Sequence, residues 1–399
     1  MKKLIIAGLG PGDFDMMTDE VKRELEKSDL ICGAKRLLEG FKDKPTAEEY
    51  RAEKIRPYLL SGKYENVCVL MSGDSGFYSG TLKLYEEFKD DGMLSDWDIK
   101  VLPGISSVSF LASKLKESYD DAAILNAHGR SDWQAKLVYN VRYNKKTFVL
   151  TSGKAQAEEI RSLIKIYFAG EVISIWAGEN LSYPDEKIYE ISDEDETGDG
   201  IITLFIKNTS PEPKFVGKVI EDDEFIRGDV PMTKQEVRQI SIGKLGLFEG
   251  AVLLDLGCGT GSVAVSAAAL SPNIKVYAVD INPEAVKLTK ENALKHKCAN
   301  VFISEGDICE YLKNGGFDMP THAFVGGNGG KLNEIVNILR EINPDITIVV
   351  NAITLETISA ATSLMTNGGE AVFVQTDRNR RVGKSNMVIS ENRIMIVRL

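Results

Sequence analysis

The chain is poor in cysteine and histidine and has no long hydrophobic run. Its 399 residues include five cysteines, an odd number, and these are scattered without CxxC spacing. Disulfide bonds and a zinc site are therefore not expected, and the expected location is a reducing cytoplasm. Three histidines also argue against a His-rich metal site. Because no apolar run approaches the ~20 residues needed to span a bilayer, we expect no membrane segment.

The chain also lacks an excess of positive charge, since its net charge is −11. This balance argues against a general nucleic-acid-binding protein, which is usually basic. The segment 375–399 is an exception, because it has six basic residues and two acidic ones. It is either a binding site for a small polyanion or a solvated surface loop, and the sequence leaves both interpretations open.

The length of the chain is sufficient for two domains of ordinary size. Its content of 43% hydrophobic and 27% charged residues is typical of a globular protein. The segment 208–214 reads NTSPEPK, and two prolines among polar residues are typical of a linker. We therefore expect one domain over 1–207, a linker over 208–214 and a second domain over 215–399.

In the second half, short apolar runs alternate with amphipathic segments. This alternation predicts an α/β fold with a doubly wound, mainly parallel sheet. The last two strands have no helix between them, which predicts an antiparallel pair at one edge. The expected strands are 252–256, 275–280, 300–304, 322–325, 347–351, 370–376 and 394–398, and the expected helices are 261–270, 283–296, 331–340 and 355–365.

The first half also alternates, but less regularly, and its glycines follow several strands rather than one. It is again predicted to be α/β. The expected strands are 4–7, 67–72, 100–102, 147–151, 172–176 and 200–207, and the expected helices are 18–27, 80–89 and 106–115.

A glycine-rich loop, Asp255-Leu256-Gly257-Cys258-Gly259-Thr260-Gly261, follows one apolar run of the second half. Its glycines let the backbone turn tightly and approach a ligand without Cβ clashes. Asp280 ends the next apolar run and completes a nucleoside pocket of the Rossmann kind, where it is expected to bind both ribose hydroxyls. Asp255 is expected to hold an amino or ribose group, and Asp307 the exocyclic amine of adenine. The pattern suits NAD or S-adenosylmethionine, and its GxGxG spacing favours the methyl donor.

A second glycine-rich turn, Gly326-Gly327-Asn328-Gly329-Gly330, precedes a helix expected to begin at Lys331. Free backbone N–H groups and the positive end of the helix dipole suit a carboxylate. A tight turn without a ligand is the alternative, although four glycines in five residues exceed what a turn needs. We expect substrate carboxylates to bind here and at the basic segment, through Gly327, Asn328, Gly329, Lys331, Arg380 and Arg381.

Residues 240–399 resemble the class I S-adenosylmethionine-dependent methyltransferases. Four ordered motifs are similar to one family among them, the decarboxylating cobalamin-pathway methyltransferases that methylate carbon 15 of a precorrin and remove a carboxyl from an acetate arm. The motifs are VPMTKQEVR (230–238), GCGTG (257–261), VGGNGG (325–330) and NAITLET (351–357). The resemblance implies donor contacts from Thr233, Gly257, Cys258, Gly259, Thr260, Gly261, Asp280 and Ile308. Cys258 replaces the usual small residue of the loop, and we interpret it as a buried structural thiol.

The first half carries four glycine-containing stretches at the ends of expected strands. They are GLGPGD (8–13), SGDSGFYSG (72–80), PGISS (103–107) and GENLSYPD (178–185). The first stretch alone is a weak signal, but together they resemble the tetrapyrrole methylase family over 1–207.

Among tetrapyrrole methylases, the GENLSYPDE and NAHGR (126–130) stretches look most like the enzymes that methylate carbon 5 of a precorrin. The resemblance implies a two-lobed fold with the methyl donor in the cleft. His128 and Arg130 are expected to face the substrate, although a structural role suits His128 equally. The expected donor contacts are Gly10, Pro11, Gly73, Asp74, Ser75, Gly76, Ser106 and Ser107.

Both halves together resemble the bifunctional precorrin-6Y C(5,15)-methyltransferases (decarboxylating) or their cobalt-precorrin counterparts. This resemblance implies one S-adenosylmethionine per domain and a precorrin macrocycle as partner, and it assigns no catalytic residue. One alternative is an RNA base methyltransferase, against which the acidic charge and the missing Asn/Asp-Pro-Pro-aromatic motif argue. The other is a non-catalytic S-adenosylmethionine or tetrapyrrole sensor, against which the intact Asp255 and Asp280 argue. We also expect a homo-oligomer that binds neither nucleic acid nor membrane.

Overall fold

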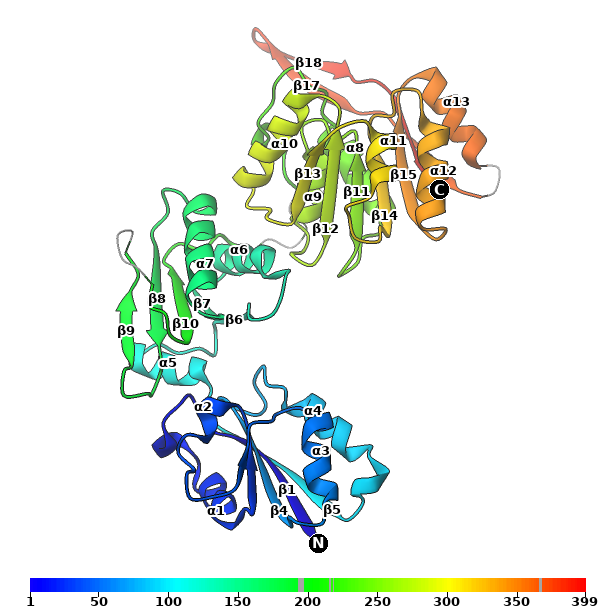
Figure 1. Ribbon diagram of the computed structural model, residues 1–399. Helices are drawn as coiled ribbons and strands as arrows, with labels where there is room; N and C mark the ends of the chain where they lie inside the picture. Colours follow the sequence, from blue (N-terminus) through cyan, green and yellow to red (C-terminus); the bar gives the residue numbers. More distant parts are fainter. Residues whose placement is uncertain (193–196, 215–216, 218, 366–367) are drawn as a thin grey trace. The chain divides into compact units, whose positions relative to one another are not determined.

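The computed structural model describes all residues except 193–196, 215–216, 218 and 366–367 (Figure 1). The chain forms two compact units: unit 1 is Met1–Trp133 with Asn144–Pro211, and unit 2 is Gln134–Tyr143 with Glu212–Leu399. The division near residue 211 falls inside the segment that the sequence marks as a linker. Among the described residues, no helix is long and apolar enough to cross a membrane.

The first lobe of unit 1 is a parallel five-stranded sheet in the order β3-β2-β4-β1-β5. Side chains alternate along β1, so Leu4 and Ile6 pack with α3 and α4 on one face, while Ile5 and Ala7 pack with α1 and α2 on the other. The elements are β1 (Lys2–Gly8), η1 (Phe14–Met16), α1 (Asp19–Lys27), β2 (Leu30–Cys32), α2 (Lys35–Leu38), β3 (Thr46–Ala47), α3 (Ala52–Leu60), β4 (Asn66–Met71), α4 (Thr81–Lys89), η2 (Gly92–Leu94) and β5 (Trp97–Leu102).

The second lobe of unit 1 is a mixed sheet in the order β6-β7-β10-β8-β9. Only the β6–β7 pair is parallel, and the other pairs are antiparallel. Helix α5 packs on this sheet through Val108 and Leu111, against Phe148 and Phe205. The elements are α5 (Ser107–Leu115), β6 (Ala123–Asn126), β7 (Lys146–Leu150), α7 (Lys154–Tyr167), β8 (Ile173–Glu179), β9 (Lys187–Glu190) and β10 (Ile202–Asn208).

The three tryptophans of the chain all belong to unit 1. Trp97 begins β5 and Trp133 begins α6 (Trp133–Tyr143), and both side chains are buried. Trp176 lies on β8 and is partly buried.

Unit 2 contains a seven-stranded sheet in the order β13-β12-β11-β14-β15-β19-β16. The strands from β13 to β15 are parallel, whereas β19 pairs antiparallel with both β15 and β16. The predicted doubly wound sheet with an antiparallel edge pair is therefore confirmed. The strands are β11 (Val252–Leu256), β12 (Lys275–Asp280), β13 (Val301–Glu305), β14 (His322–Val325), β15 (Thr347–Ala352), β16 (Glu370–Val374) and β19 (Ile394–Arg398).

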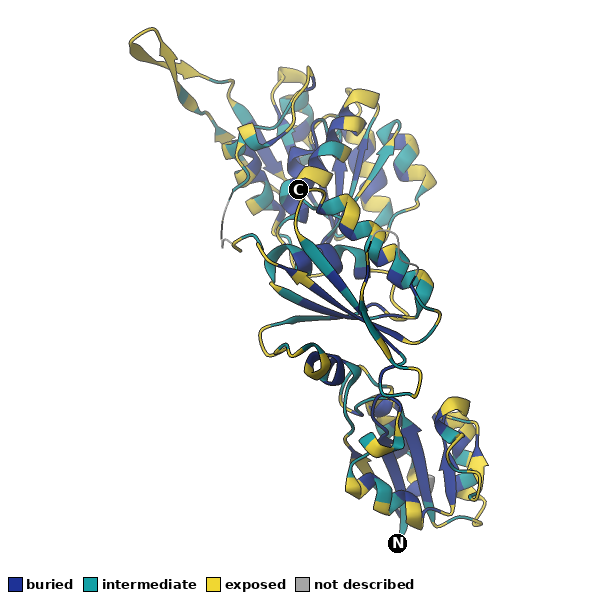
Figure 2. Cartoon of the chain, turned by 90° about the vertical axis from the view of Figure 1, so that its left-hand side faces the viewer, coloured by how far each residue is buried: buried dark blue, intermediate teal, exposed yellow. Residues whose placement is uncertain are grey.

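Helices cover both faces of the unit 2 sheet. Leu253 faces the core formed with α8, α9 and α10, while Leu254 and Leu256 face the core formed with α11, α12 and α13. Buried residues therefore line the centre of this unit (Figure 2). The helices are η3 (Asp222–Glu224), α8 (Gln235–Leu245), α9 (Ser262–Ala268), α10 (Pro283–Lys295), α11 (Ile308–Asn314), α12 (Leu332–Ile342) and α13 (Leu355–Leu364).

Helix α6 groups with unit 2, although it precedes the linker in sequence. The Nε atom of Arg142 on this helix donates to Glu212 at 2.8 Å, and Lys297 Nζ donates to the same carboxylate at 2.7 Å. These two cations lower the pKa of Glu212, although partial burial opposes the shift. This arrangement was not predicted from the sequence.

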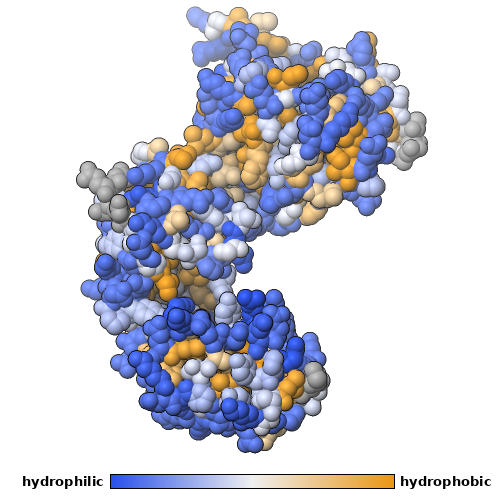
Figure 3. Space-filling view, in the orientation of Figure 1, coloured by the Kyte–Doolittle hydropathy of each residue, from blue (hydrophilic) through white to orange (hydrophobic). Residues whose placement is uncertain are grey.

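The basic segment near the C-terminus is not a surface loop. It forms an antiparallel hairpin of β17 (Asp377–Val382) and β18 (Ser385–Ser390), which extends from the body of unit 2 (Figures 1 and 2). Met387 and Val388 are 52% and 72% exposed. Elsewhere, hydrophilic residues predominate on the face of the protein shown in Figure 3.

Candidate functional site

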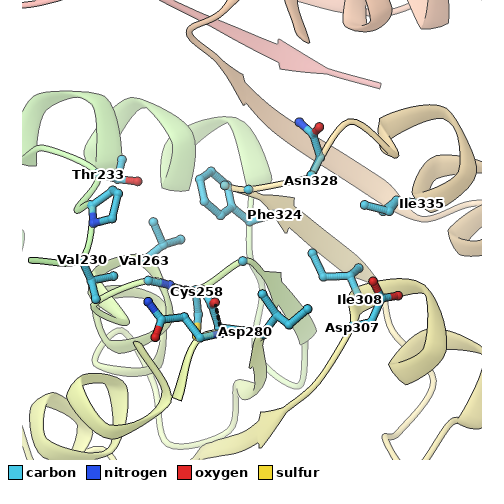
Figure 4. A pocket seen from close by; sticks show the side chains of 18 of the residues that line it. Val230, Thr233, Cys258, Val263, Asp280, Asp307, Ile308, Phe324, Asn328 and Ile335 are labelled. Carbon is cyan, nitrogen blue, oxygen red and sulfur yellow. Dashed lines mark hydrogen bonds between the residues drawn. The ribbon is translucent and has the colours of Figure 1, made fainter. Parts of the chain in front are cut away.

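A cavity of about 560 Å³ lies in unit 2 beyond the carboxyl ends of β11, β12, β13 and β14 (Figure 4). Open α/β sheets bind ligands at this edge. Thr233 and Val230, which precede α8, lie on one side of the cavity, and Asp307 and Ile308 lie on the other. The predicted site residues in its wall are Thr233, Gly257, Cys258, Gly259, Asp280, Asp307, Ile308, Gly327, Asn328, Gly329 and Lys331.

The loops after β11 and β14 touch each other at Gly257. This residue has a φ of +74°, and a Cβ atom added to it would lie 2.7 Å from Gly327 N. Gly326 N also donates to Leu256 O at 3.0 Å. Only glycine satisfies both the left-handed backbone and the close approach.

Asp280 holds the floor of the cavity in place. Its Oδ2 accepts a hydrogen bond from Gly259 N at 2.9 Å, and its Oδ1 accepts one from Asn282 N at 2.9 Å. Because an ionised carboxylate has about four lone-pair sites, both oxygens retain acceptor capacity for a ligand. The position of Asp280 in the wall suits the diol that the sequence assigned to it.

Asp255 lies beneath the cavity rather than in its wall. Its Oδ2 accepts a hydrogen bond from Ala264 N at 2.9 Å, and its Oδ1 is buried without a hydrogen-bond partner among the described residues. Burial raises the pKa of Asp255 to about 7, Asp280 adds to the shift, and the bond from Ala264 opposes it. The expected direct contact between Asp255 and a donor is therefore not seen.

Two further loop residues also lie outside the cavity wall. Thr260 is fully buried, and Gly261 is the N-cap of α9. Cys258 does line the cavity, and its thiol is 3.4 Å from the Thr289 hydroxyl. Burial raises the pKa of this thiol well above its ordinary value. Cys258 is thus a neutral structural thiol, as the sequence suggested.

Asp307 and Lys331 are paired with each other, although the sequence assigned them to different ligands. Asp307 Oδ1 caps α11 by accepting from Cys309 N at 2.9 Å, and its Oδ2 accepts from Lys331 Nζ at 2.8 Å. The bond from Lys331 lowers the pKa of Asp307. Lys331 is therefore not free to hold a substrate carboxylate in this conformation.

A second cavity in unit 2, of about 800 Å³, shares part of its wall with the first. Both are lined by Thr233 and by the turn that contains Gly327 and Asn328. The remaining wall of the larger cavity includes residues of the NAITLET motif and of the segment after β18, namely Asn351, Ile353, Thr354, Glu356, Thr357, Glu391 and Asn392.

The turn between the two cavities offers fewer free N–H groups than the sequence suggested. Gly326 N donates to Leu256 O, and Gly330 N donates to Asn328 Oδ1 at 2.9 Å. Arg380 and Arg381 lie on β17 and line neither cavity. That the turn and the basic segment hold substrate carboxylates stays a prediction.

Unit 1 contains a smaller cavity of about 190 Å³ between its two lobes. Asp74, in the loop after β4, fixes two neighbouring loops because its Oδ1 accepts from Gly76 N at 3.3 Å and from Gly104 N at 3.2 Å. The predicted site residues in the wall of this cavity are Pro11, Gly73, Asp74, Ser106, Ser107 and His128. The others do not line it: Gly10, Ser75, Gly76 and Arg130.

Tyr183 covers the unit 1 cavity and connects the two lobes. A Cβ atom added to Gly12 would lie 2.2 Å from the Tyr183 ring, so the ring rests directly on this glycine. Arg36 Nη1 donates to Tyr183 Oη at 3.0 Å, and Asp13 N donates to Ser182 Oγ at 2.8 Å. We call these contacts, made by Gly12, Asp13, Arg36, Ser182 and Tyr183, the tyrosine latch. It was not visible in the sequence, because its two sides are far apart along the chain.

Two family models match the chain in succession. Residues 3–195 match the tetrapyrrole (corrin/porphyrin) methylases, and residues 224–398 match the precorrin methyltransferase domain. A probable cobalt-precorrin-6B C(15)-methyltransferase (decarboxylating) from Pyrobaculum aerophilum is 37% identical over 185 residues, which is 45% of this chain and 93% of that protein. The chain belongs to the precorrin methyltransferases.

Solved structures of precorrin enzymes are also similar to this precorrin methyltransferase. A precorrin 8w decarboxylase from Methanobacterium thermoautotrophicum is 34% identical, with a TM-score of 0.42, over 45% of this chain and 98% of that one. A precorrin-6y C5,15-methyltransferase from Geobacter metallireducens is 31% identical, with a TM-score of 0.42, over 45% of this chain and 95% of that one.

The residues of the first unit 2 cavity, the one that contains Asp280, fit S-adenosylmethionine, the methyl donor that methyltransferase families imply. Its volume of about 560 Å³ lies within the usual range for ligand pockets, about 300–1,000 Å³. The buried Asp255 Oδ1 beneath it, which has no hydrogen-bond partner among the described residues, suits a water that bridges to a polar ligand group. The cavity of about 190 Å³ in unit 1 is below that range.

Several hydrophobic residues that shape the cavity of about 560 Å³ in unit 2 were not predicted from the sequence. Phe324 at the end of β14 and Ile335 on α12 point into it from the far side of the glycine loop (Figure 4). Val230 and Pro231 border it from the segment before α8. Within the motif at 230–238 only Thr233 was expected to contact the donor, so the place of Val230 and Pro231 in the wall was not predicted.

Proposed function

We propose that the chain methylates precorrin-6Y, or its cobalt counterpart, at carbons 5 and 15 with S-adenosylmethionine and removes carbon dioxide from an acetate arm. The observation that carries the proposal is the common wall of the two unit 2 cavities. A donor pocket that meets a larger pocket at Thr233 and Asn328 suits the transfer of a small group to a large acceptor. The names of the similar proteins supply the substrate class.

In unit 2, the donor site is formed by Asp280, which suits the ribose, and by Ile308 and Phe324, which suit flat apolar groups. The bound donor supplies an electrophilic methyl group. The acceptor carbon belongs to an electron-rich pyrrolic ring and is itself the nucleophile, so the chain mainly contributes proximity and orientation. Because the acceptor carbon is itself the nucleophile, the reaction needs no thiolate, which agrees with the neutral thiol of Cys258.

Loss of carbon dioxide requires that the acetate be held while its bonding electrons pass into the ring. Lys234 and Asn351 line the larger cavity and are suited to hold the acetate. Asn351 Oδ1 accepts from Ser241 Oγ at 3.0 Å, which fixes the amide so that its N–H groups remain as donors. These two residues replace Lys331 as our candidates, because Lys331 is paired with Asp307.

We also propose that unit 1 performs the carbon 5 methylation and unit 2 the carbon 15 reactions, one donor each. The match to tetrapyrrole methylases over 3–195 supports this assignment. Domains over 1–207 and 215–399, a homo-oligomer and a cytoplasmic location stay predictions.

The test is an anaerobic incubation of the full chain with precorrin-6Y and S-adenosylmethionine labelled in its methyl group. Mass spectrometry of the product is expected to show two labelled methyl groups and the loss of one carbon dioxide. A product without labelled methyl groups contradicts the proposal, as does methylation of RNA in a parallel incubation. Asp280→Ala serves as the control, since it is expected to stop only the carbon 15 reactions.

A further inference from the structure

Five charged side chains connect two segments of the wall of the larger cavity in unit 2. We call the cavities of about 560 and 800 Å³ in this unit the donor cavity and the acceptor cavity, after their proposed roles. Thr233, before α8, lines both cavities, and Glu391, after β18, lines the acceptor cavity. The charged residues that connect these segments, which we call the charge network, are Asp222, Glu236, Arg238, Arg378 and Glu391.

Arg238, on α8, is the buried end of the charge network. It is 1% exposed, and its Cζ lies 4.7 Å from the centroid of the Phe225 ring. Its Nη1 donates to Asp222 Oδ1 at 3.2 Å and to Thr233 O at 2.8 Å, and its Nη2 donates to Ile220 O at 2.5 Å. Because a buried charge is costly unless it is paired, Asp222 stabilises Arg238 in the position where it holds the Thr233 carbonyl.

The carbonyl of Thr233 is held from two sides. Besides Arg238 Nη1, Ser262 Oγ donates to it at 3.4 Å, and Ser262 begins α9 directly after the glycine loop. Thr233 lies in the wall that the donor cavity and the acceptor cavity share. Any effect of Arg238 on the reaction therefore passes through Thr233, at the place where the two cavities meet.

Arg378, near the start of β17, is the other end of the charge network. Its Nη2 donates to Asp222 Oδ2 at 3.3 Å and also to Glu236, in the first turn of α8. Its Nε lies 3.4 Å from Glu391 Oε1, as an ion pair without hydrogen-bond geometry. Asp222 thus binds one arginine with each of its two oxygens, and it joins the segment that contains Thr233 to the segment that contains Glu391.

The charge network is not suited to bind the carboxylate arms of the substrate. Three carboxylates face two guanidinium groups within it, so both cations are already paired with carboxylates of the chain. Its effect is instead to hold Thr233 and Glu391 in place in the wall. Methyl transfer from a sulfonium is an in-line displacement, and a misplacement of about 1 Å can cost about 100-fold in rate.

We propose that Arg378 is a positioning residue for the carbon 15 methylation. It acts through Glu391 in the wall of the acceptor cavity and, by way of Asp222 and Arg238, through Thr233 where the two cavities meet. The proposal rests on the proposed function and names a residue that sets where the macrocycle lies relative to the bound donor. Arg378 itself lines neither cavity, so it acts only through the residues that it holds.

Single-turnover methyl transfer by the full chain, at saturating precorrin-6Y and labelled S-adenosylmethionine, tests the proposal. Rate constants are divided by the number of unit 2 sites that bind S-adenosylhomocysteine in calorimetry, which are the sites lost in Asp280→Ala, so unfolded molecules do not contribute. Arg378→Gln is expected to lower the rate constant for carbon 15 methylation by about 10-fold or more, with donor affinity within about twofold of the parent's. Arg378→Lys is expected to recover part of the rate, since it keeps the charge but lacks the planar guanidinium that reaches several carboxylates.

Two further variants separate positioning from a purely structural role. Asp318→Asn removes the ion pair with Lys275, between residues of unit 2 that line neither cavity, and is expected to leave the rate per site within about twofold. Glu391→Gln is expected to lower the rate less than Arg378→Gln does, and the double variant is expected to be no slower than Arg378→Gln alone, because both changes break the same contact.

Two results would overturn the proposal. If Arg378 contributed only to stability, the rate per site of Arg378→Gln would equal the parent's. If the effects of Arg378→Gln and Glu391→Gln added in full, Glu391 would act independently of Arg378.

Failure of the inference is distinct from failure of the proposed function. If the parent chain methylates the tetrapyrrole twice and Arg378→Gln has the parent's rate per site, only the positioning role is wrong. If the parent chain transfers no methyl group to any tetrapyrrole, both the function and the positioning role are wrong.

Discussion

The two cavities that we propose as donor sites, one in each unit, are built in different ways. In unit 2, loops at one edge of a single sheet enclose about 560 Å³, and the decisive glycine loop is continuous in sequence. In unit 1, segments from two sheets enclose about 190 Å³, and the tyrosine latch covers them. In unit 2 the glycine loop is continuous in sequence, and loops of one sheet alone determine the volume of the cavity. A site assembled from two lobes has a volume that depends on how those lobes close.

The largest expected effect comes from removing the carboxylate in each cavity. Asp280→Ala deletes both bonds to a ribose, at about 1.5–3 kcal/mol each, so donor affinity in unit 2 is expected to fall by at least about 100-fold. Asp74→Ala is expected to weaken only the unit 1 site, by about 10-fold, since it loosens two loops. Calorimetry with S-adenosylhomocysteine on the full chain counts the sites. Loss of the same site in both variants would contradict the comparison.

Glycine substitutions compare how rigid the two cavities are. Gly257→Ala combines a left-handed φ with a clash against the backbone of Gly327, and we expect a loss of about 2–5 kcal/mol in the stability of unit 2. In Gly12→Ala the three atoms nearest to the new Cβ all belong to the Tyr183 side chain, which shifts more easily than backbone, so a loss of about 1 kcal/mol is expected. Gly243→Ala, where nothing lies within 4 Å, is the control. Equal thermal shifts in the two test variants would show that the latch is as rigid as the sheet edge.

The buried carboxylate of unit 2 is expected to make that unit sensitive to pH. Because the pKa of Asp255 is raised to about 7, its contribution to stability is present at low pH and is lost as the pH rises through about 7. From 3.8 to about 7 the shift is about 3 units, so at about 1.4 kcal/mol per unit the loss is at most about 4 kcal/mol, of which about 3 kcal/mol falls between pH 5 and pH 7. Asp255→Asn should flatten this dependence in thermal unfolding at pH 5 and pH 8. A variant with the parent's slope would show that Asp255 is ionised in the folded chain over this range.

Charge reversal on the hairpin is expected to have the smallest effect. Arg380 and Arg381 line neither of the two unit 2 cavities described above, but β18 leads directly into the segment that borders the cavity of about 800 Å³. Their change to Glu is expected to weaken macrocycle binding by about 10-fold at low salt, to lose this effect at high salt, and to leave donor binding unchanged. Substrate titration at two salt concentrations is the measurement. An affinity and a salt dependence equal to the parent's would assign the substrate carboxylates to other residues.

The sequence predicted the unit 2 sheet well because its strands are buried on both faces. Val252–Leu256 and Thr347–Ala352 are nearly continuous apolar runs between glycines and polar loops, so their type and order are visible. The hairpin was missed because β17 carries the charged sequence DRNRRV, which has no apolar alternation. Helix α8 was missed for a similar reason, since its buried residues include Arg238 and Ser241.

The loops that form the candidate sites were predictable from the sequence, but the residues that contact these loops from distant parts of the chain were not. The glycine loop and Asp280 were identified because each lies next to its own strand. The Asp307–Lys331 pair and the contact between Gly12 and Tyr183 join segments that are distant along the chain, and only the fold brings them together. The same reason explains why the hydrogen bond from Arg36 to Tyr183 was not predicted from the sequence.

Because all three tryptophans are assigned to unit 1, tryptophan fluorescence reports the two units unequally. Trp97, Trp133 and Trp176 are the sources of indole emission, and unit 2 contributes none of it. Fluorescence from Trp97 and Trp176 therefore follows the melting of unit 1, whereas Trp133 begins α6, whose remaining residues belong to unit 2, and far-ultraviolet circular dichroism follows both units. If the units unfold independently, dichroism will show a transition that fluorescence does not, and if they unfold together the two curves will coincide.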